Sequence, residues 1–335
     1  AESGGWLRTR DLVTGEIAHQ QRLRSSPNED VTCIAATHDK IWVGGNRGLL
    51  CVFRISDHKH VADCVLHESG ITALCVQDGA VLATGTDGRL SIWANESLTC
   101  VSFLVVARGP VNCVTSCRRA DLGMFTPTMP PGGVTTTRDA TIVLCNGDDN
   151  VLNMWTTTDA AQLPSAVFRG HTAPILCVAV VGGNRLWTGS EDMSVRVWNP
   201  TTQSCLRELR HHRGAVHIVM AVPDDPKVWT ASIDGTVALW DASTLTCLGD
   251  LPVSYPRDRP DHFIFAIAPV ARAQVWRVWT SSTDGTVRSW LSQQDALTSP
   301  LNPANQPAAV IPPQLLEDLE AHRQEARAAM AECEA

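Results

Sequence analysis

The sequence predicts an all-β fold built from a repeated unit of short strands, and three observations carry this prediction. One segment recurs with a period of about 40 residues: RLWTGSEDMSVRVWN at 185–199, KVWTASIDGTVALWD at 227–241 and RVWTSSTDGTVRSWL at 277–291. Each copy contains a turn with an Asp, and each carries a Trp near its end. Repeats of this length with closing aromatic residues are typical of a radial β-array, so we predict a β-propeller.

Fainter copies precede and separate these three. We place the closing position of successive units at Phe53, Trp93, Trp155, Trp198, Trp240 and Trp290. Within 174–209, alternating apolar residues and intervening turn residues predict four short antiparallel strands. Strands this short cannot bury both faces of a lone sheet. We therefore expect the sheets to stack as blades and to close into a ring, which removes most exposed edges.

The ends of the chain leave the blade number open between six and seven. Residues 6–10 and 17–23 predict two strands at the start, and residues 262–290 predict three at the end. In one arrangement, 17–23 completes the 262–290 unit and gives six complete blades with one strand left over. In the arrangement that we favour, 6–16 forms the third strand and following turn of a seventh blade.

The repeated unit resembles the WD-repeat β-propeller family over residues 1–291. The resemblance implies a buried hydrogen-bond relay in a blade. It joins a His before the first strand, a Ser or Thr on the second, an Asp in the next turn and the closing Trp. Three blades fit this pattern, with His67, Thr86, Asp87 and Trp93; His171, Ser190, Asp192 and Trp198; and His212, Ser232, Asp234 and Trp240. A buried Asp is costly unless it accepts hydrogen bonds, so the relay would satisfy all its members together.

Composition argues against several classes of protein. The formal net charge of −8 makes a nucleic-acid partner unexpected, because phosphates are bound by Lys and Arg. The apolar runs are too short to span a bilayer, and we expect no secretory signal because the first residues lack a basic head and an apolar stretch. Several of the 12 cysteines recur at equivalent positions and none forms a CxxC pair. We therefore expect buried, reduced thiols in a cytoplasmic protein.

No set of residues predicts catalysis, a cofactor or a metal site. The sequence lacks a phosphate-binding Gly-rich motif, a GxSxG elbow and an HExxH pair. We assign His212 to the relay and His211 to the surface rather than to a metal. Acidic pairs at 148–149 and 191–192 fall in turns where blades need Asp. These observations favour a protein that is not an enzyme.

The turns between second and third strands are expected to surround the central channel on one face. In the family that the chain resembles, this face most often receives peptide segments of partner proteins. By position alone, the candidate contacts are Arg47, Thr86, Asp148, Glu191, Ile233 and Thr283. We therefore expect a non-catalytic protein–protein interaction scaffold. The alternative is a targeting or regulatory module of a larger enzyme, for example an inositol-phosphate phosphatase, whose catalytic domain lies outside this chain.

Three segments depart from the repeat. Residues 118–139 are rich in Pro, Gly and Thr and predict a flexible loop inserted between two strands. Residues 292–312 predict a linker. Residues 313–335 predict a C-terminal helix with apolar residues at heptad spacing. That helix either lies on the propeller or begins a coiled coil through which the parent protein oligomerises.

Overall fold

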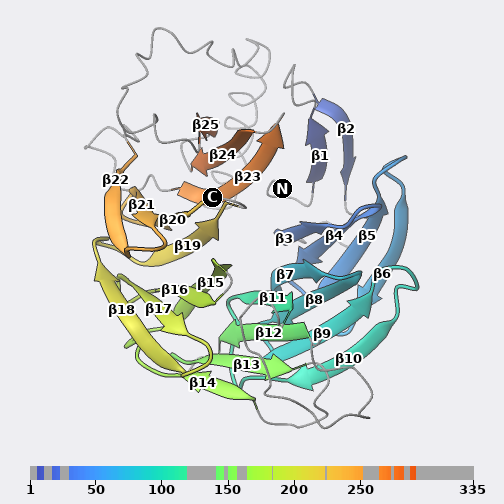
Figure 1. The fold of residues 1–335 in the computed structure, drawn as a ribbon. Helices are drawn as coiled ribbons and strands as arrows, with labels where there is room; N and C mark the ends of the chain where they lie inside the picture. Colours follow the sequence, from blue (N-terminus) through green and yellow to red (C-terminus); the bar gives the residue numbers. More distant parts are fainter. Residues whose placement is uncertain are drawn as a thin grey trace, which may run out of the picture.

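The fold is a ring of antiparallel β-sheets around a central axis (Figure 1). The computed structural model describes residues 6–10, 17–22, 30–118, 141–146, 150–156, 164–182, 184–222, 225–251, 264–272, 275–282 and 287–291. Every regular element in this part of the chain is a β-strand, and no helix with the length and hydropathy of a membrane span is found there. The prediction of an all-β propeller with four-stranded antiparallel blades is confirmed.

Five of the sheets in the described part of the chain contain four strands each. The first two are β3 (Val31–Ala36), β4 (Lys40–Gly45), β5 (Leu49–Arg54) and β6 (His60–Val65), and β7 (Ile71–Gln77), β8 (Ala80–Gly85), β9 (Arg89–Ala94) and β10 (Cys100–Val105). The third is β11 (Val114–Arg118), β12 (Thr141–Asn146), β13 (Leu152–Thr156) and β14 (Ala166–Phe168). The last two are β15 (Ile175–Val181), β16 (Arg185–Ser190), β17 (Ser194–Asn199) and β18 (Ser204–Arg210), and β19 (Val216–Ala221), β20 (Lys227–Ser232), β21 (Val237–Asp241) and β22 (Thr246–Asp250).

The two ends of the chain form smaller sheets. β23 (Ile264–Arg272), β24 (Val275–Ser282) and β25 (Val287–Leu291) make a three-stranded sheet, and β1 (Trp6–Arg10) pairs with β2 (Ile17–Arg22). The six-blade arrangement would require β2 to pair with the sheet of β23–β25. Among the described strands, β2 does not join that sheet. The linker at 292–312 and the helix at 313–335 lie outside the described residues. The loop at 118–139 does too, apart from Arg118 at the end of β11.

Position in the sheet determines how a strand is buried. The first strand of each four-stranded sheet lies nearest to the axis and the fourth lies at the outer edge (Figure 1). Every residue of the second strand β20 is buried, because its side chains pack between neighbouring sheets on both faces. The outer strand β10 instead alternates between half-buried and exposed residues, as expected where one face meets water.

The core is divided among the interfaces between adjacent sheets. Trp187 on β16 packs in one cluster with Val216 and Trp240 of the next sheet. Trp42 on β4 packs with Ile71 and other residues of the sheet that follows it. Both indoles are fully buried. Each sheet therefore gains its stability from its neighbours, as the shortness of the strands requires.

The cysteines differ in part from the prediction. The ten with described side chains include no disulfide, and Cys51, Cys64, Cys113 and Cys117 are buried. Cys205 and Cys247 are exposed, so the expectation of buried thiols is wrong at these two positions. They lie on β18 and β22, outer strands with one face toward solvent.

Candidate functional site

The tight turns between second and third strands lie at one end of the sheets, beside the start of the innermost strands. The backbone N–H of Thr86 donates to the Gly70 carbonyl at 2.9 Å, and that of Glu191 donates to the Pro174 carbonyl at 3.0 Å. Equivalent bonds hold the turns that begin at Asn46 and Ile233. We define the turn face by these four turns, residues 46–48, 86–88, 191–193 and 233–235.

Behind the turn at 191–193, four side chains form a directed chain of hydrogen bonds. His171 Nδ1 lies 2.7 Å from Asp192 Oδ2. An ionised carboxylate can only accept, so Nδ1 donates and Nε2 of the neutral ring is an acceptor. The Thr188 hydroxyl, 2.8 Å from Nε2, therefore donates to it, and Trp198 Nε1 donates to the Thr188 oxygen at 2.9 Å. Every donor in the chain points toward Asp192.

Burial and hydrogen bonding give Asp192 and His171 different charges near neutral pH. Burial opposes ionisation of Asp192, but hydrogen bonds from Ser194, His171 and the Thr172 N–H outweigh it and lower its pKa to about 2. Burial also lowers the pKa of His171, and the neighbouring Asp192 only partly opposes that effect. The pair is therefore a carboxylate and a neutral imidazole, the arrangement that the bond directions require.

The hydroxyl of the relay differs from the prediction in this blade. The sequence assigned it to Ser190, but Thr188 occupies that place, two residues deeper in β16. The Ser190 hydroxyl instead donates to the Ala173 carbonyl at 3.0 Å and accepts the Asp192 N–H at 3.1 Å.

The same correction applies to the blade of β19–β22. Thr230, not Ser232, contacts both His212 Nε2 at 2.7 Å and Trp240 Nε1 at 2.9 Å. His212 Nδ1 lies 3.6 Å from Asp234 and is bridged to it by the Thr236 hydroxyl, which is 2.9 Å from the ring and donates to the carboxylate at 2.6 Å.

In the blade of β7–β10, the hydroxyl comes from a different strand. Ser91 on β9 lies 2.9 Å from His67 Nε2 and accepts from Trp93 Nε1 at 2.8 Å. His67 Nδ1 lies 3.0 Å from Asp87. The predicted Thr86 takes no part in the relay, because it sits in the turn and donates to Ser69 at 2.7 Å.

Substitution of the two hydroxyl residues of β16 separates the observed relay from the predicted one. We expect Thr188→Val to lower the free energy of unfolding by about 2–3 kcal/mol, because it leaves His171 Nε2 and Trp198 Nε1 buried without their partner. Ser190→Ala is expected to cost about 1 kcal/mol. Urea unfolding followed by tryptophan fluorescence measures both. A larger loss for Ser190→Ala would contradict the assignment.

A cavity of about 460 Å³ lies on the axis next to the turn face. Residues of several sheets line it, namely Thr32, Asn46, Gly70, Ile71, Thr72, Thr86, Asn112, Leu176 and His217. Four of these are the second residue of an innermost strand, where the ladder to the next strand skips one residue: Thr32, Thr72, Leu176 and His217. A bulge of this kind re-aims a side chain, and here it places that side chain at the axial cavity.

Several of the cavity-lining side chains also join neighbouring sheets. The Thr72 hydroxyl donates to the Val111 carbonyl, and the Asn112 amide donates to the Ile175 carbonyl at 3.3 Å. His217 Nε2 bonds the Ile264 carbonyl at the start of β23. The side chains that line the cavity therefore also link neighbouring sheets.

The structure gathers four of the six predicted contact residues on the turn face. Arg47, Thr86, Glu191 and Ile233 are exposed there. Asp148 and Thr283 lie outside the described residues.

Met193 is a turn-face residue that the sequence analysis missed. It has a positive φ of 65° and is 48% exposed. The equivalent positions in the other three turns are Gly48, Gly88 and Gly235, also with positive φ. A Met in this conformation costs free energy, and such strain is concentrated at functional sites. The sequence does contain a signal that could have identified Met193, because one repeat has Asp-Met where others have Asp-Gly.

Two clusters of possible metal ligands also escaped the sequence analysis. Cys51 lies with His60 and Asp63, and His211 lies with Cys247 and Asp250. In each cluster the ligand atoms lie within 4.8 Å of one another. Two members of each cluster lie three residues apart, His60 with Asp63 and Cys247 with Asp250. Strand pairing brings Cys51 to the first pair and a loop brings His211 to the second, so no local motif contains all three ligands.

A comparison with models of protein families matches three segments of the chain to one repeat family. The model described as "WD domain, G-beta repeat" matches residues 55–94, 162–199 and 203–241.

Curated relatives match parts of the chain. WD repeat-containing protein pop2 of Schizosaccharomyces pombe is 22% identical over 215 residues, which cover 59% of this chain and 30% of that protein. WD repeat and HMG-box DNA-binding protein 1 of Homo sapiens is 29% identical over 161 residues, covering 42% of this chain and 14% of the relative. A guanine nucleotide-binding protein subunit beta of Arabidopsis thaliana is 34% identical over 94 residues, covering 26% of this chain and 24% of the relative. The chain thus spans less than a third of each of these relatives.

Solved structures share the fold over most of the chain. A chain in the crystal structure of a mitotic checkpoint complex superposes with a TM-score of 0.68 at 16% identity, covering 84% of this chain and 80% of that one. A computationally designed protein superposes with a TM-score of 0.63 at 20% identity, covering 87% and 79%. At these identities the likeness concerns the fold alone.

Proposed function

This chain belongs to the WD-repeat β-propeller family, and from that premise we propose that it is a non-catalytic scaffold which binds a segment of a partner protein on the turn face. WD-repeat propellers generally serve as protein-interaction scaffolds. The fold alone does not specify a partner, so the proposal depends on the properties of this face.

The exposed apolar residues of the turn face are the observation that carries the proposal. Ile233 and Met193 are each 48% exposed, although turns in water favour polar residues. Both lie in turns at the end of the sheets where the axial cavity opens. Apolar side chains on a partly concave surface are typical of a protein-binding site.

The chemistry around the cavity favours a partner segment with an apolar anchor and uncharged hydrogen-bonding groups. The described cavity wall combines the hydroxyls of Thr32 and Thr72 and the amide of Asn112 with the apolar side chain of Leu176. On the surrounding turns, Arg47 and Glu191 carry opposite charges. Such a surface gives no strong preference for a highly charged partner.

We also propose that the ring has seven blades, with β1 and β2 in the seventh, since these strands pair with each other. The absence of disulfides among the described cysteines supports a reducing compartment such as the cytoplasm. The C-terminal helix and any oligomerisation through it stay predictions from the sequence.

A second role, as a module within a longer protein, has support in the relatives. WD repeat and HMG-box DNA-binding protein 1 combines WD repeats with another domain. The names of an F-box/WD-40 repeat-containing protein and of a DENN domain and WD repeat-containing protein, both of Arabidopsis thaliana, show the same combination. None of these relatives is described as a phosphatase. The proposal is therefore a binding module whose neighbouring domain is not specified.

Substitution of Ile233 tests the turn face. We expect Ile233→Asp to reduce capture of the partner by about tenfold or more, because it places a charge at an apolar contact. Val105→Asp is the matched control, since Val105 is 69% exposed on the outer strand β10. The measurement is quantitative mass spectrometry of proteins that co-purify with the tagged parent protein and each variant. If every co-purifying protein is retained equally by both variants, the turn face is not the binding site.

A further inference from the structure

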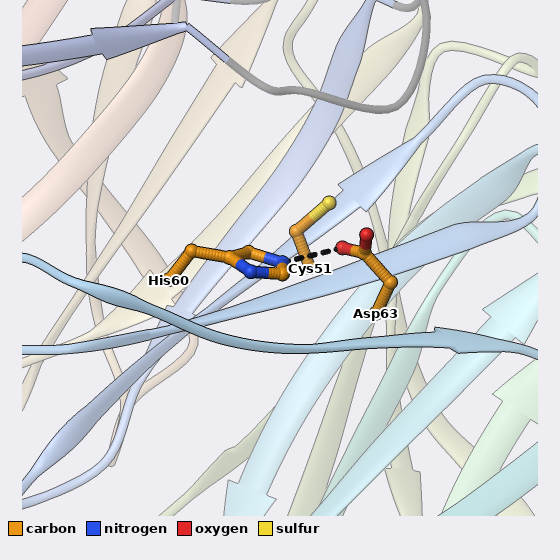
Figure 2. Close-up of side chains that lie close together, drawn as sticks. All are labelled: Cys51, His60 and Asp63. Carbon is orange, nitrogen blue, oxygen red and sulfur yellow. Dashed lines mark hydrogen bonds and ion pairs between the residues drawn. The ribbon is translucent and has the colours of Figure 1, made fainter.

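We propose that Cys51, His60 and Asp63 form a binding site for a divalent transition metal ion of the zinc type, with three protein ligands and a fourth position open to water. Figure 2 shows the three side chains converging from the paired strands β5 and β6. Their ligand atoms lie within 4.8 Å of one another, and His60 Nε2 is 2.7 Å from Asp63 Oδ1. This site is independent of the turn face.

The strand pairing explains why these residues meet. Cys51 and Asp63 are direct cross-strand partners, so their side chains project from the same face. The register shifts between Val52 and Phe53, and this bulge pairs Phe53 with His60. The Phe53 ring holds the imidazole in an edge-on contact, with centroids 5.4 Å apart. Two ligands are thus fixed by the ladder and the third is positioned by an aromatic neighbour.

The donor set matches the preferences of zinc. A thiolate, an imidazole nitrogen and a carboxylate oxygen are its usual ligands, and three of them plus water complete a tetrahedral site. Ionised Cys51 and Asp63 with a neutral His60 carry two negative charges, which a divalent cation neutralises. Binding would release the Cys51 thiol proton to solvent.

The geometry favours a metal site over a nucleophilic cysteine. In a catalytic triad, one ring nitrogen of the His faces the nucleophile and the other faces the carboxylate. Here Figure 2 shows Nε2, the nitrogen bonded to Asp63, on the side of the ring toward Cys51. Convergence of three donors on one point is the arrangement of a coordination site.

Small movements suffice to admit the ion. Ligand atoms around tetrahedral zinc are about 3.5 Å apart, given bonds of about 2.0–2.3 Å. The distance of 2.7 Å between His60 Nε2 and Asp63 Oδ1 must therefore increase by about 0.8 Å. Both side chains have room for this, since they are 27% and 38% exposed. Cys51 is only 2% exposed, and it provides the fixed, shielded ligand.

The second cluster, His211 with Cys247 and Asp250, serves as an internal comparison. All three of its residues are exposed, and His211 lies in a loop rather than on a strand. Cys247 Sγ lies 4.0 Å from His211 Nε2. A site made of exposed side chains should hold a metal more weakly, because more freedom is lost on binding.

Cobalt(II), whose absorption reports thiolate ligation, is the probe. We expect the reduced, metal-free chain to bind Co²⁺ with a thiolate-to-metal charge-transfer band that Zn²⁺ abolishes by displacement. His60→Gln and Asp63→Asn, which alter partly exposed side chains, should each weaken binding about tenfold or more, and Cys51→Ser should remove the band. Cys64→Ser is the matched control, since Cys64 packs in the cluster shared with β7 and β8.

The outcomes are distinguishable. Weaker binding of one Co²⁺ equivalent by the His60 and Asp63 variants supports the site, whether or not a second equivalent depends on Cys247. The proposal is overturned if the unaltered chain gives no thiolate band, if the His60 and Asp63 variants bind Co²⁺ as tightly as the unaltered chain, or if Cys247→Ser alone removes the band. Circular dichroism of each variant shows that the fold is retained, and the His60 and Asp63 variants keep the test valid if Cys51→Ser does not fold.

Discussion

Asp192→Asn is expected to lower the free energy of unfolding by about 3–5 kcal/mol, because hydrogen bonds to a charged acceptor contribute about 1.5–3 kcal/mol each and more than one is lost. Asp192 accepts hydrogen bonds from His171 at 2.7 Å, from the Ser194 hydroxyl at 2.6 Å and from the backbone N–H of Ser194 and Thr172 at 3.0 and 3.1 Å. An Asn of the same shape carries an NH₂ group where one carboxylate oxygen accepted, so buried donors lose their partner. Urea unfolding at neutral pH measures the loss.

The neighbouring Glu191 provides the control. It is an exposed carboxylate next to Asp192 in the same turn. Glu191→Gln is expected to change stability by less than about 0.5 kcal/mol, as is usual for surface substitutions. Similar losses for the two variants would show that the relay does not hold the blade together.

The relay also predicts how stability depends on pH. Burial lowers the pKa of His171, so the unfolded chain takes up a proton more readily and stability falls as pH drops below about 6.5. Asp192 has its pKa lowered to about 2, so its contribution is complete above the ordinary value of 3.8 and is lost as pH falls from there toward 2. The advantage of the unaltered chain over Asp192→Asn should therefore shrink in acid.

Gly88→Ala is expected to cost about 3 kcal/mol or more. Gly88 has a φ of +74°, which L-residues rarely adopt, and an added Cβ would lie 2.3 Å from the Ala107 carbonyl oxygen. That oxygen belongs to backbone held in place, since the N–H groups of Val106 and Ala107 both donate to the Gly88 carbonyl. The turn and the segment after β10 must therefore separate.

Gly79→Ala separates the two causes of the loss of stability in Gly88→Ala, which are backbone strain and the contact with the Ala107 carbonyl. Gly79 has a φ of +77°, but an added Cβ would meet nothing within 4 Å. It is expected to cost about 1–2 kcal/mol, from backbone strain alone. Thermal and urea unfolding of the two variants give the difference. If the two variants lose the same free energy of unfolding, the contact with Ala107 does not contribute to the cost of Gly88→Ala.

The candidate site was predictable only in part. Recurring Asp residues in the turns located the turn face, because a repeated turn sits at the same place in every blade. The hydroxyl of the relay was placed wrongly at Ser190, since two hydroxyls lie on the same face of β16 and only the depth of the imidazole selects Thr188. The bulges that direct Thr72 and His217 to the axial cavity have no marker in composition or spacing.

The Gly88 turn shows the same division on a smaller scale. An Asp-Gly pair is enough to predict a turn with positive φ, because that preference depends on the residue itself. Whether a side chain could fit there depends on the Ala107 carbonyl, which belongs to a different segment. In the equivalent position of another blade, Met193 adopts a similar φ.

The all-β fold, the repeated unit and the position of its turns were predictable from the sequence, because they follow from local alternation and from residues that favour turns. The hydroxyl that completes each relay, the side chains that line the axis and the meeting of Cys51 with His60 and Asp63 became known from the folded structure. The physical reason is that such contacts depend on strand register, on bulges and on the reach of side chains between strands. A change of one residue in register moves every side chain to the opposite face.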